Sequence, residues 1–150
     1  WMSSLECQIQ EGDCGDFIPL AGPDVKLTLK KRGKGRPIFD FNGEYVYGAG
    51  YVSHSPSVEK PNGEWNTVEI YTVGQTSIFL VNGTPNMVLF EATKKEGSKR
   101  VPLTKGKIQI QSEAAEVYYK DIEIKNIEKF PEHIQKYINK PKTEAVKFSK

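Results

Sequence analysis

Amide and carboxylate side chains alternate with apolar side chains at the start of the chain. In SLECQIQ, residues 4–10, every second residue is polar, and KIQIQ at residues 107–111 repeats the pattern. Alternation of this kind predicts strands with one buried face. The polar groups of that parity are Glu6, Gln8, Gln10, Gln109 and Gln111. They form a set of hydrogen-bonding amides with one carboxylate that could transfer a proton.

Strand-like segments recur along the chain, separated by turn residues rich in Gly, Asn and Asp. No segment of helical period interrupts them, which predicts an all-β antiparallel sandwich or barrel. The strand-like segments are residues 4–10, 25–31, 44–52, 65–73, 77–83, 86–92, 107–111 and 116–127. Asn82 and Gly83 predict a hairpin turn. Residues 130–138, with Pro131 near their start, are the one predicted helix.

The length, the net charge and the apolar runs of the chain limit the classes of function that it could have. The chain has 150 residues, enough for one domain with a real core. Its net charge is +2, from 21 basic and 19 acidic residues, which gives nucleic-acid binding little support. Lys30, Lys31, Arg32 and Arg36 are the densest basic group, and they read as a solvated loop or as an anion-binding loop. The longest apolar runs are far shorter than the roughly 20 residues of a transmembrane helix.

The two cysteines do not define a disulfide framework. Cys7 shares the apolar parity of its strand, which predicts a buried free thiol. A bridge to Cys14 would require the intervening turn to fold back on the strand. The cysteines therefore do not show whether the protein occurs in an oxidising or a reducing compartment.

Four stretches, in order, resemble the 3-keto-disaccharide hydrolase family. They are SLECQIQEGDCGDF, EKPNGEWNTVEIYTVG, LVNG and LTKGKIQIQSEAAEVYYKDIEI, and the resemblance runs from about Trp1 to Ile127. It implies a concanavalin A-like jelly-roll β-sandwich whose concave sheet binds saccharide. It also implies a secreted or periplasmic protein that cleaves glycosides oxidised at the 3-position.

Two departures from the family pattern affect these expectations. Family members usually carry further strands before the position of Trp1, so the sandwich is expected over residues 1–127 without its N-terminal strands, and residues 128–150 as helix and tail. Where the family often has a His before the hairpin turn, this chain has Phe79. A proton-transfer role at that position is therefore not expected.

A sugar-binding face favours amides and carboxylates for the hydroxyls and an aromatic ring for the ring face. The alternating glutamines and Glu6 meet the first requirement, and Trp65 is the candidate for the second. The parity of Val68 and Ile70 predicts that they face the core and that Trp65 and Glu69 face the other way. The alternatives are a hydrated sheet surface for the glutamines and a packing role for Trp65.

Cleavage of a 3-keto-glycoside needs a base for the acidified C2 proton and a group that stabilises the enolate oxygen. Glu6 is our first candidate for the base, followed by Glu113 and Glu69. Lys60 and Lys120 are candidates for stabilising the oxyanion. A solvated surface charge is the alternative for each.

The histidines and the acidic turn allow two further hypotheses. His54 lies in the loop YVSHSPSVEKP, where it could act as acid or base, or be merely exposed. His133 lies in the predicted helix and receives no role. Glu11, Asp13 and Asp16 could hold calcium or could simply stabilise the turn EGDCGD. Two His and two Cys at these spacings do not make a zinc site.

The sequence thus favours a carbohydrate-active hydrolase or lyase acting on 3-keto-glycosides. A noncatalytic carbohydrate-binding module that uses the same face is the second hypothesis. A structural or adhesive sandwich, with glutamines that are only solvated, is the third.

Overall fold

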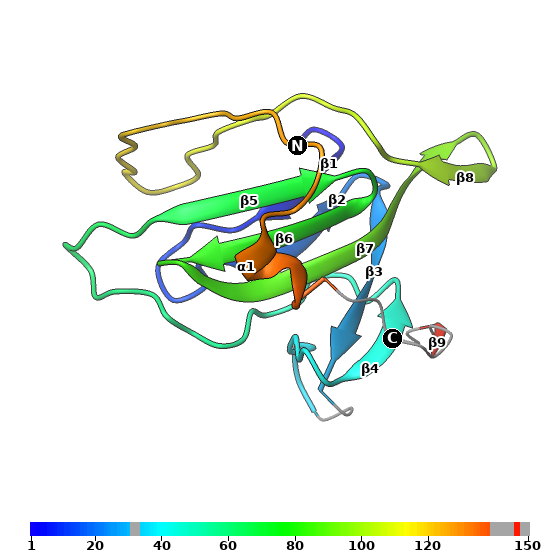
Figure 1. The fold of residues 1–150 in the computed structure, drawn as a ribbon, viewed down its shortest axis with the longest axis horizontal. Helices are drawn as coiled ribbons and strands as arrows, with labels where there is room; N and C mark the ends of the chain where they lie inside the picture. The colour runs from blue at the N-terminus through cyan, green and yellow to red at the C-terminus, as the bar shows by residue number, and fades with distance from the viewer. Residues whose placement is uncertain (31–33, 139–145, 148–150) are drawn as a thin grey trace.

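The computed structural model describes residues 1–30, 34–138 and 146–147. Figure 1 shows strands throughout and one short helix, which confirms the predicted all-β class. The strands are β1 (Ser4–Cys7), β2 (Phe17–Leu20), β3 (Asp24–Leu29), β4 (Glu44–Tyr47), β5 (Val68–Val73), β6 (Thr76–Val81), β7 (Thr84–Glu96), β8 (Lys99–Pro102) and β9 (Val146–Lys147). The helix is α1 (Glu132–Gln135), inside the range predicted for it but shorter.

The strands form two sheets, arranged as in a jelly-roll β-sandwich. β1 and β2 pair with each other, and the larger sheet has the order β5-β6-β7-β3-β4-β9, with β8 added beside β7. All pairs are antiparallel except β4 with β9. β7 joins the two halves of the larger sheet, because its first part pairs with β6 and its second part with β3 and β8.

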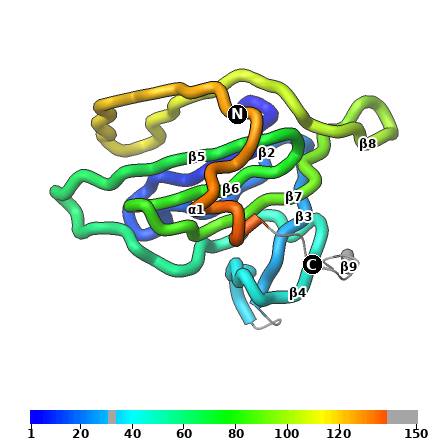
Figure 2. The backbone as a smooth tube through the Cα atoms, in the orientation of Figure 1, coloured from blue at the N-terminus to red at the C-terminus, as the bar shows by residue number. Residues whose placement is uncertain are grey.

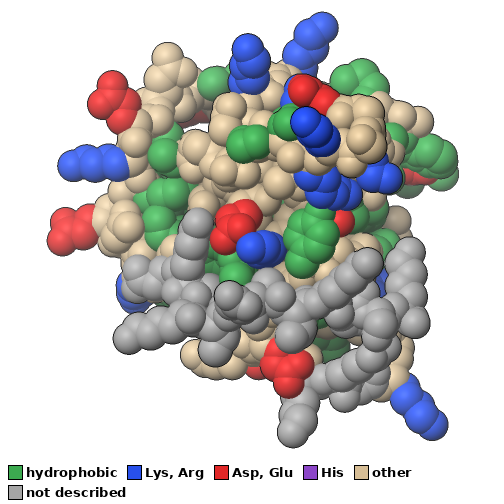
Figure 3. All heavy atoms as spheres, turned by 90° about the vertical axis from the view of Figure 1, so that its right-hand side faces the viewer, with side chains coloured by type: hydrophobic (Ala, Val, Ile, Leu, Met, Phe, Trp, Pro, Cys, Tyr) green, Lys and Arg blue, Asp and Glu red, His purple; other side chains and the backbone are tan. Residues whose placement is uncertain are grey.

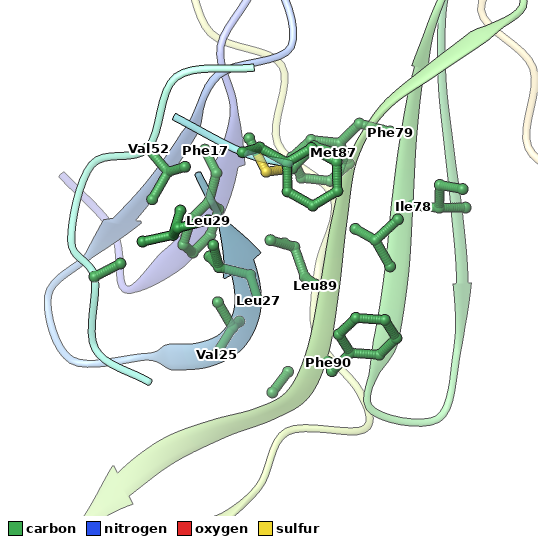
Figure 4. Close-up of a cluster of buried hydrophobic side chains, with 14 of the residues drawn as sticks. Phe17, Val25, Leu27, Leu29, Val52, Ile78, Phe79, Met87, Leu89 and Phe90 are labelled. Atoms are coloured by element: carbon green, nitrogen blue, oxygen red, sulfur yellow. The ribbon is translucent and has the colours of Figure 1, made fainter. Parts of the chain in front are cut away.

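The main core lies between β7 on one side and β2, β3 and the segment around Val52 on the other. Figure 4 shows Met87 and Leu89 pointing from β7 toward Phe17 and Leu27. These side chains are almost completely buried. The core therefore joins the β1–β2 pair, which carries the acidic turn, to the larger sheet.

A second apolar layer covers the opposite face of β6. Every residue from Ser77 to Val81 is buried, so both faces of this strand are covered. Phe130 and Ile134 belong to the same core cluster, and Figure 1 shows α1 in front of β6. The ring of Tyr71 on β5 meets His133 edge-on, with centroids 6.5 Å apart.

The structure contradicts two predicted strands. Residues 103–131, all of them described, contain no strand or helix, although strands were expected at 107–111 and 116–127. Figure 2 shows this stretch, yellow to orange, as a long excursion beside β5. Ile108 is 75% exposed. Alternation marks an extended chain with two unlike faces, but a strand also needs a neighbour for its N–H and C=O groups, and no described segment provides one here.

Two further expectations need correction. The first strand ends at Cys7 and not at residue 10. On β5, Tyr71 and Val73 pack against the core, whereas Ile70 is 54% exposed. The predicted parity was therefore wrong. β5 is the edge strand of the larger sheet. Its Tyr71 face is covered near α1, whereas its Ile70 face is left more exposed to solvent. The predicted turn at Asn82 and Gly83 is confirmed, and both residues have positive φ.

In Figure 3, basic and acidic side chains are interspersed on the face that is turned toward the viewer. With only 4 residues, α1, the helix of the described part of the chain, is far too short to span a membrane.

Replacing Ile134 by Ala should lower the free energy of unfolding by about 2–5 kcal/mol, because a buried side chain is removed and a cavity is left. Ile134 is 1% exposed, whereas Ile124 is 72% exposed. Ile124→Ala is therefore the control, with an expected change within about 0.5 kcal/mol. Urea denaturation measures both. Equal losses in the two variants would contradict the position given to α1.

Candidate functional site

The turn after β1 is held by its own backbone and by Gln8. The N–H of Gln8 donates to the carbonyl of Asp16, and the N–H of Gly15 donates to the carbonyl of Gln8. The side-chain Oε1 of Gln8 accepts from the N–H groups of Ile9 and Gln10, at 2.8 and 3.2 Å. These bonds tie the carbonyl and the Oε1 atom of Gln8 into the turn, and a contact of Gln8 with a saccharide stays a prediction.

Asp16 and His54 form the most enclosed polar pair of the site. Oδ1 of Asp16 accepts the backbone N–H of His54 at 2.7 Å and lies 2.5 Å from His54 Nδ1. The Asp16 side chain is 0% exposed and the His54 side chain 7%. Burial raises the pKa of Asp16, but the hydrogen bonds and charge of His54 outweigh burial and leave this pKa below its ordinary value.

An ionised Asp16 determines which ring nitrogen of His54 carries the proton. A carboxylate only accepts hydrogen bonds, so Nδ1 must be the donor. In the neutral imidazole, Nε2 is then the basic nitrogen. The pair has the geometry of a carboxylate that orients a histidine for proton transfer.

Arg36 and Tyr51 complete this cluster. Nη1 of Arg36 lies 3.2 Å from Asp16 Oδ2 and 3.6 Å from Asp13 Oδ1. The guanidinium stacks on the Tyr51 ring at 3.8 Å, and the Tyr51 hydroxyl donates to Asp13 Oδ2 at 3.3 Å. Burial, together with the charges of Asp16 and Asp13, raises the pKa of Tyr51 to about 12. Both aspartates are therefore bonded by groups of the protein itself.

The loop that carries His54 is fastened to the acidic turn at a second point. Both carboxylate oxygens of Glu59 accept the N–H of Gly12, at 3.0 and 2.9 Å, and Oε2 also accepts the N–H of Cys14 at 3.3 Å. The two segments thus form one unit, although 45 residues separate Cys14 from Glu59.

Glu6 lies in a second polar group, with Glu113 and Gln111. Partial burial, and then the charge of Glu113, raise the pKa of Glu6 above its ordinary value. Nε2 of Gln111 donates to Glu113 Oε2 at 3.1 Å. The first strand and the segment after residue 107 therefore bring their polar groups together, even though the second segment is not a strand.

The remaining predicted residues are dispersed. Nζ of Lys120 lies 4.4 Å from the ring centroid of Trp65, which is 50% exposed. Glu69 accepts the Tyr71 hydroxyl at 2.9 Å, on the parity that packs toward the core. Lys60 is exposed, and its backbone N–H donates to Asn66. Gln10 and Gln109 are exposed.

The acidic turn was also considered as a metal site. Among the described residues, no group of three His, Cys, Asp or Glu side chains is arranged to hold a metal ion. Glu11 is exposed, and Asp13 and Asp16 face Arg36.

Cys7 and Cys14 are free thiols. Burial raises the pKa of both, that of Cys14 to about 11, so both stay protonated at neutral pH. Lys31 and Arg32 lie outside the described residues.

Comparison with known families identifies the domain. The 3-keto-alpha-glucoside-1,2-lyase-like domain matches residues 1–125. The chain belongs to this family. No curated protein and no solved structure is significantly similar to it.

In this lyase-like domain, sequence reasoning placed His54 among the candidates but did not foresee its partners. Asp16 was considered only as a calcium ligand or turn residue, and Arg36 only as part of a basic loop. The signal that could have indicated the pair is the second Asp of EGDCGD directly before buried Phe17, because an acidic residue next to a core strand needs a partner.

Acidification should destabilise the lyase-like domain through Asp16. Its folded pKa lies below the ordinary value of 3.8, so the stability from its ionised form is complete above that value and is lost as the pH falls through the folded pKa. Asp16→Asn should be less stable at neutral pH, and it should lose less stability on acidification.

Urea denaturation from neutral pH to about pH 2 measures this difference. Exposed Asp121→Asn removes the same charge and should follow the wild type. An Asp16→Asn variant with the full wild-type acid dependence would show that Asp16 is not the group responsible.

Proposed function

We propose that this lyase-like domain cleaves 3-keto-α-glucosides by elimination. The carbonyl at C3 acidifies the C2 proton. A base removes this proton, and the electron pair of the C2–H bond forms an enolate with C3. The C1–O bond then breaks to give a C1–C2 double bond, and the departing oxygen takes a proton from an acid. Later addition of water would complete a hydrolysis.

The observation that carries the proposal is the His54–Asp16 pair. Neutral imidazole is a suitable base near neutral pH. Asp16 fixes the ring and leaves Nε2 as the basic nitrogen, and it is positioned to stabilise the imidazolium that forms when C2 loses its proton. The neighbouring Arg36 balances the buried negative charge of Asp16. We therefore assign the base to His54, where sequence reasoning favoured Glu6.

Glu6 then serves as the acid for the leaving oxygen. Burial and the nearby Glu113 raise its pKa, so a larger fraction of Glu6 is protonated than of an ordinary surface Glu. Gln111, bonded to Glu113, supplies an amide for the sugar hydroxyls. On the same proposal, the protein acts on saccharides as a secreted or periplasmic enzyme.

A noncatalytic saccharide-binding module is the second candidate, and the exposure of Trp65 favours it. Trp65 is 50% exposed, and a stacking platform must be accessible. Lys120 lies over the ring, so a sugar would have to displace it or use the other ring face. This function predicts retention of glycans that falls on Trp65→Ala, with no cleavage of oxidised or plain glycosides.

His54→Gln and Glu6→Gln should each reduce the turnover of a 3-keto-α-glucoside by about 10²–10⁴-fold, because each removes a proton-transfer group. NMR of the released sugar measures turnover. The matched controls are His133→Gln, at the other histidine, and exposed Glu11→Gln, and both should keep wild-type turnover.

Full turnover in His54→Gln would remove His54 from the role of base, and full turnover in Glu6→Gln would remove Glu6 from the role of acid. A wild-type protein that binds the glycoside without cleaving it would overturn the lyase proposal and leave the binding module.

A further inference from the structure

A β-bulge in β7 places a buried amide beside the candidate site. Along β6 and β7, Phe79 is opposite Met87, but the next residue, Leu80, is opposite Pro85. Asn86 is therefore the extra residue, without an opposite partner on β6. A bulge redirects the side chain of the extra residue, and such irregularities are frequent beside active sites.

Asn86 bonds to both segments that form the His54–Asp16 pair. Its Nδ2 donates to the carbonyl of Cys14, two residues before Asp16, at 3.3 Å. Its backbone carbonyl accepts the N–H of Ser55, next to His54, at 3.1 Å. One residue of the sheet thus holds the turn on one side and the loop on the other.

The contact with the turn is too close for any side chain at position 15. A Cβ on Gly15 would lie 2.2 Å from Nδ2 of Asn86, and Gly15 has a φ of +99°, where a side chain is strained. The turn can therefore approach Asn86 only because a glycine stands there.

The buried amide of Asn86 lowers the stability of the folded protein. Asn86 is completely buried, and its Oδ1 has no hydrogen-bond partner among the described residues. An unbonded buried oxygen opposes folding. The reverse orientation of the amide would set Oδ1 against the Cys14 carbonyl, so the bond to Cys14 determines its direction. An apolar side chain would avoid this cost, which indicates that the bond to the turn matters here.

We propose that Asn86 is a positioning residue that holds the acidic turn against the loop, so that Asp16 stays bonded to His54. This inference rests on the proposed function for its effect on turnover. Asn86 need not touch the substrate. It acts through the placement of Cys14 and Ser55, the neighbours of the reacting pair.

Two variants test the role. Asn86→Ala removes the donor together with most of the side chain, and Asn86→Leu removes the donor while it keeps about the same size. Each should lower kcat by about tenfold to hundredfold with little change in KM, because the imidazole is misplaced while the sugar contacts remain. Val88→Ala, a buried change on the same strand, is the control for mere destabilisation and should keep the wild-type kcat when folded.

A second readout does not depend on activity. In the wild-type protein, the Nδ1 proton of His54 should give a slowly exchanging NMR resonance, because the ring nitrogen is buried against Asp16. His54→Gln identifies this resonance by its loss. The resonance should broaden or exchange rapidly in both Asn86 variants and persist in Val88→Ala.

The outcomes separate the two proposals. If the Asn86 variants keep both the resonance and the wild-type kcat, the positioning role is wrong, whatever His54 does. If the wild type cleaves no 3-keto-glucoside, the proposed function fails, and loss of the resonance in the Asn86 variants would still support the positioning role.

Discussion

The buried carboxylate of Asp16 is the constraint on which the site depends. An ionised group removed from water is stable only where other groups replace its hydration, and here the His54 ring, the His54 backbone and Arg36 do so. The same bonds join the turn after β1 to a loop nearly 40 residues later. The hydrogen bonds and the ion pair of Asp16 therefore compensate its charge, hold the loop in place and orient the imidazole of His54.

The sheets provide the rigid support for this pair. Phe17, which follows Asp16, lies in the core against Met87, and Met87 follows the bulge residue Asn86. Packing thus fixes both the end of the acidic turn and the strand that contacts it. The Glu6 group has a different support, because its partners Glu113 and Gln111 lie on a long excursion outside the sheets. Its geometry depends more on side-chain contacts and less on the core.

Local pattern predicted the all-β class, the hairpin at Asn82 and the place of the helix, because each follows from residue period or turn chemistry. The local pattern did not predict features that depend on which strands pair with one another. Residues 107–111 alternate correctly but have no neighbouring strand in the part of the chain that the structure describes. The exposure of Ile70 depends on the edge position of β5 and on α1, both of which are non-local. The Asp16–His54 pair was missed for the same reason, since no local pattern links a turn to a distant loop.

In the reaction that we propose, His54 removes the C2 proton of a 3-keto-glucoside. The most direct measurement is the exchange of that proton for deuterium, followed by NMR in D₂O with wild type and with His54→Gln. We expect the wild type to exchange the C2 hydrogen, or to release product with a primary isotope effect at C2, and His54→Gln to do so about 10²–10⁴-fold more slowly. Undiminished C2 exchange in His54→Gln would contradict this proposal.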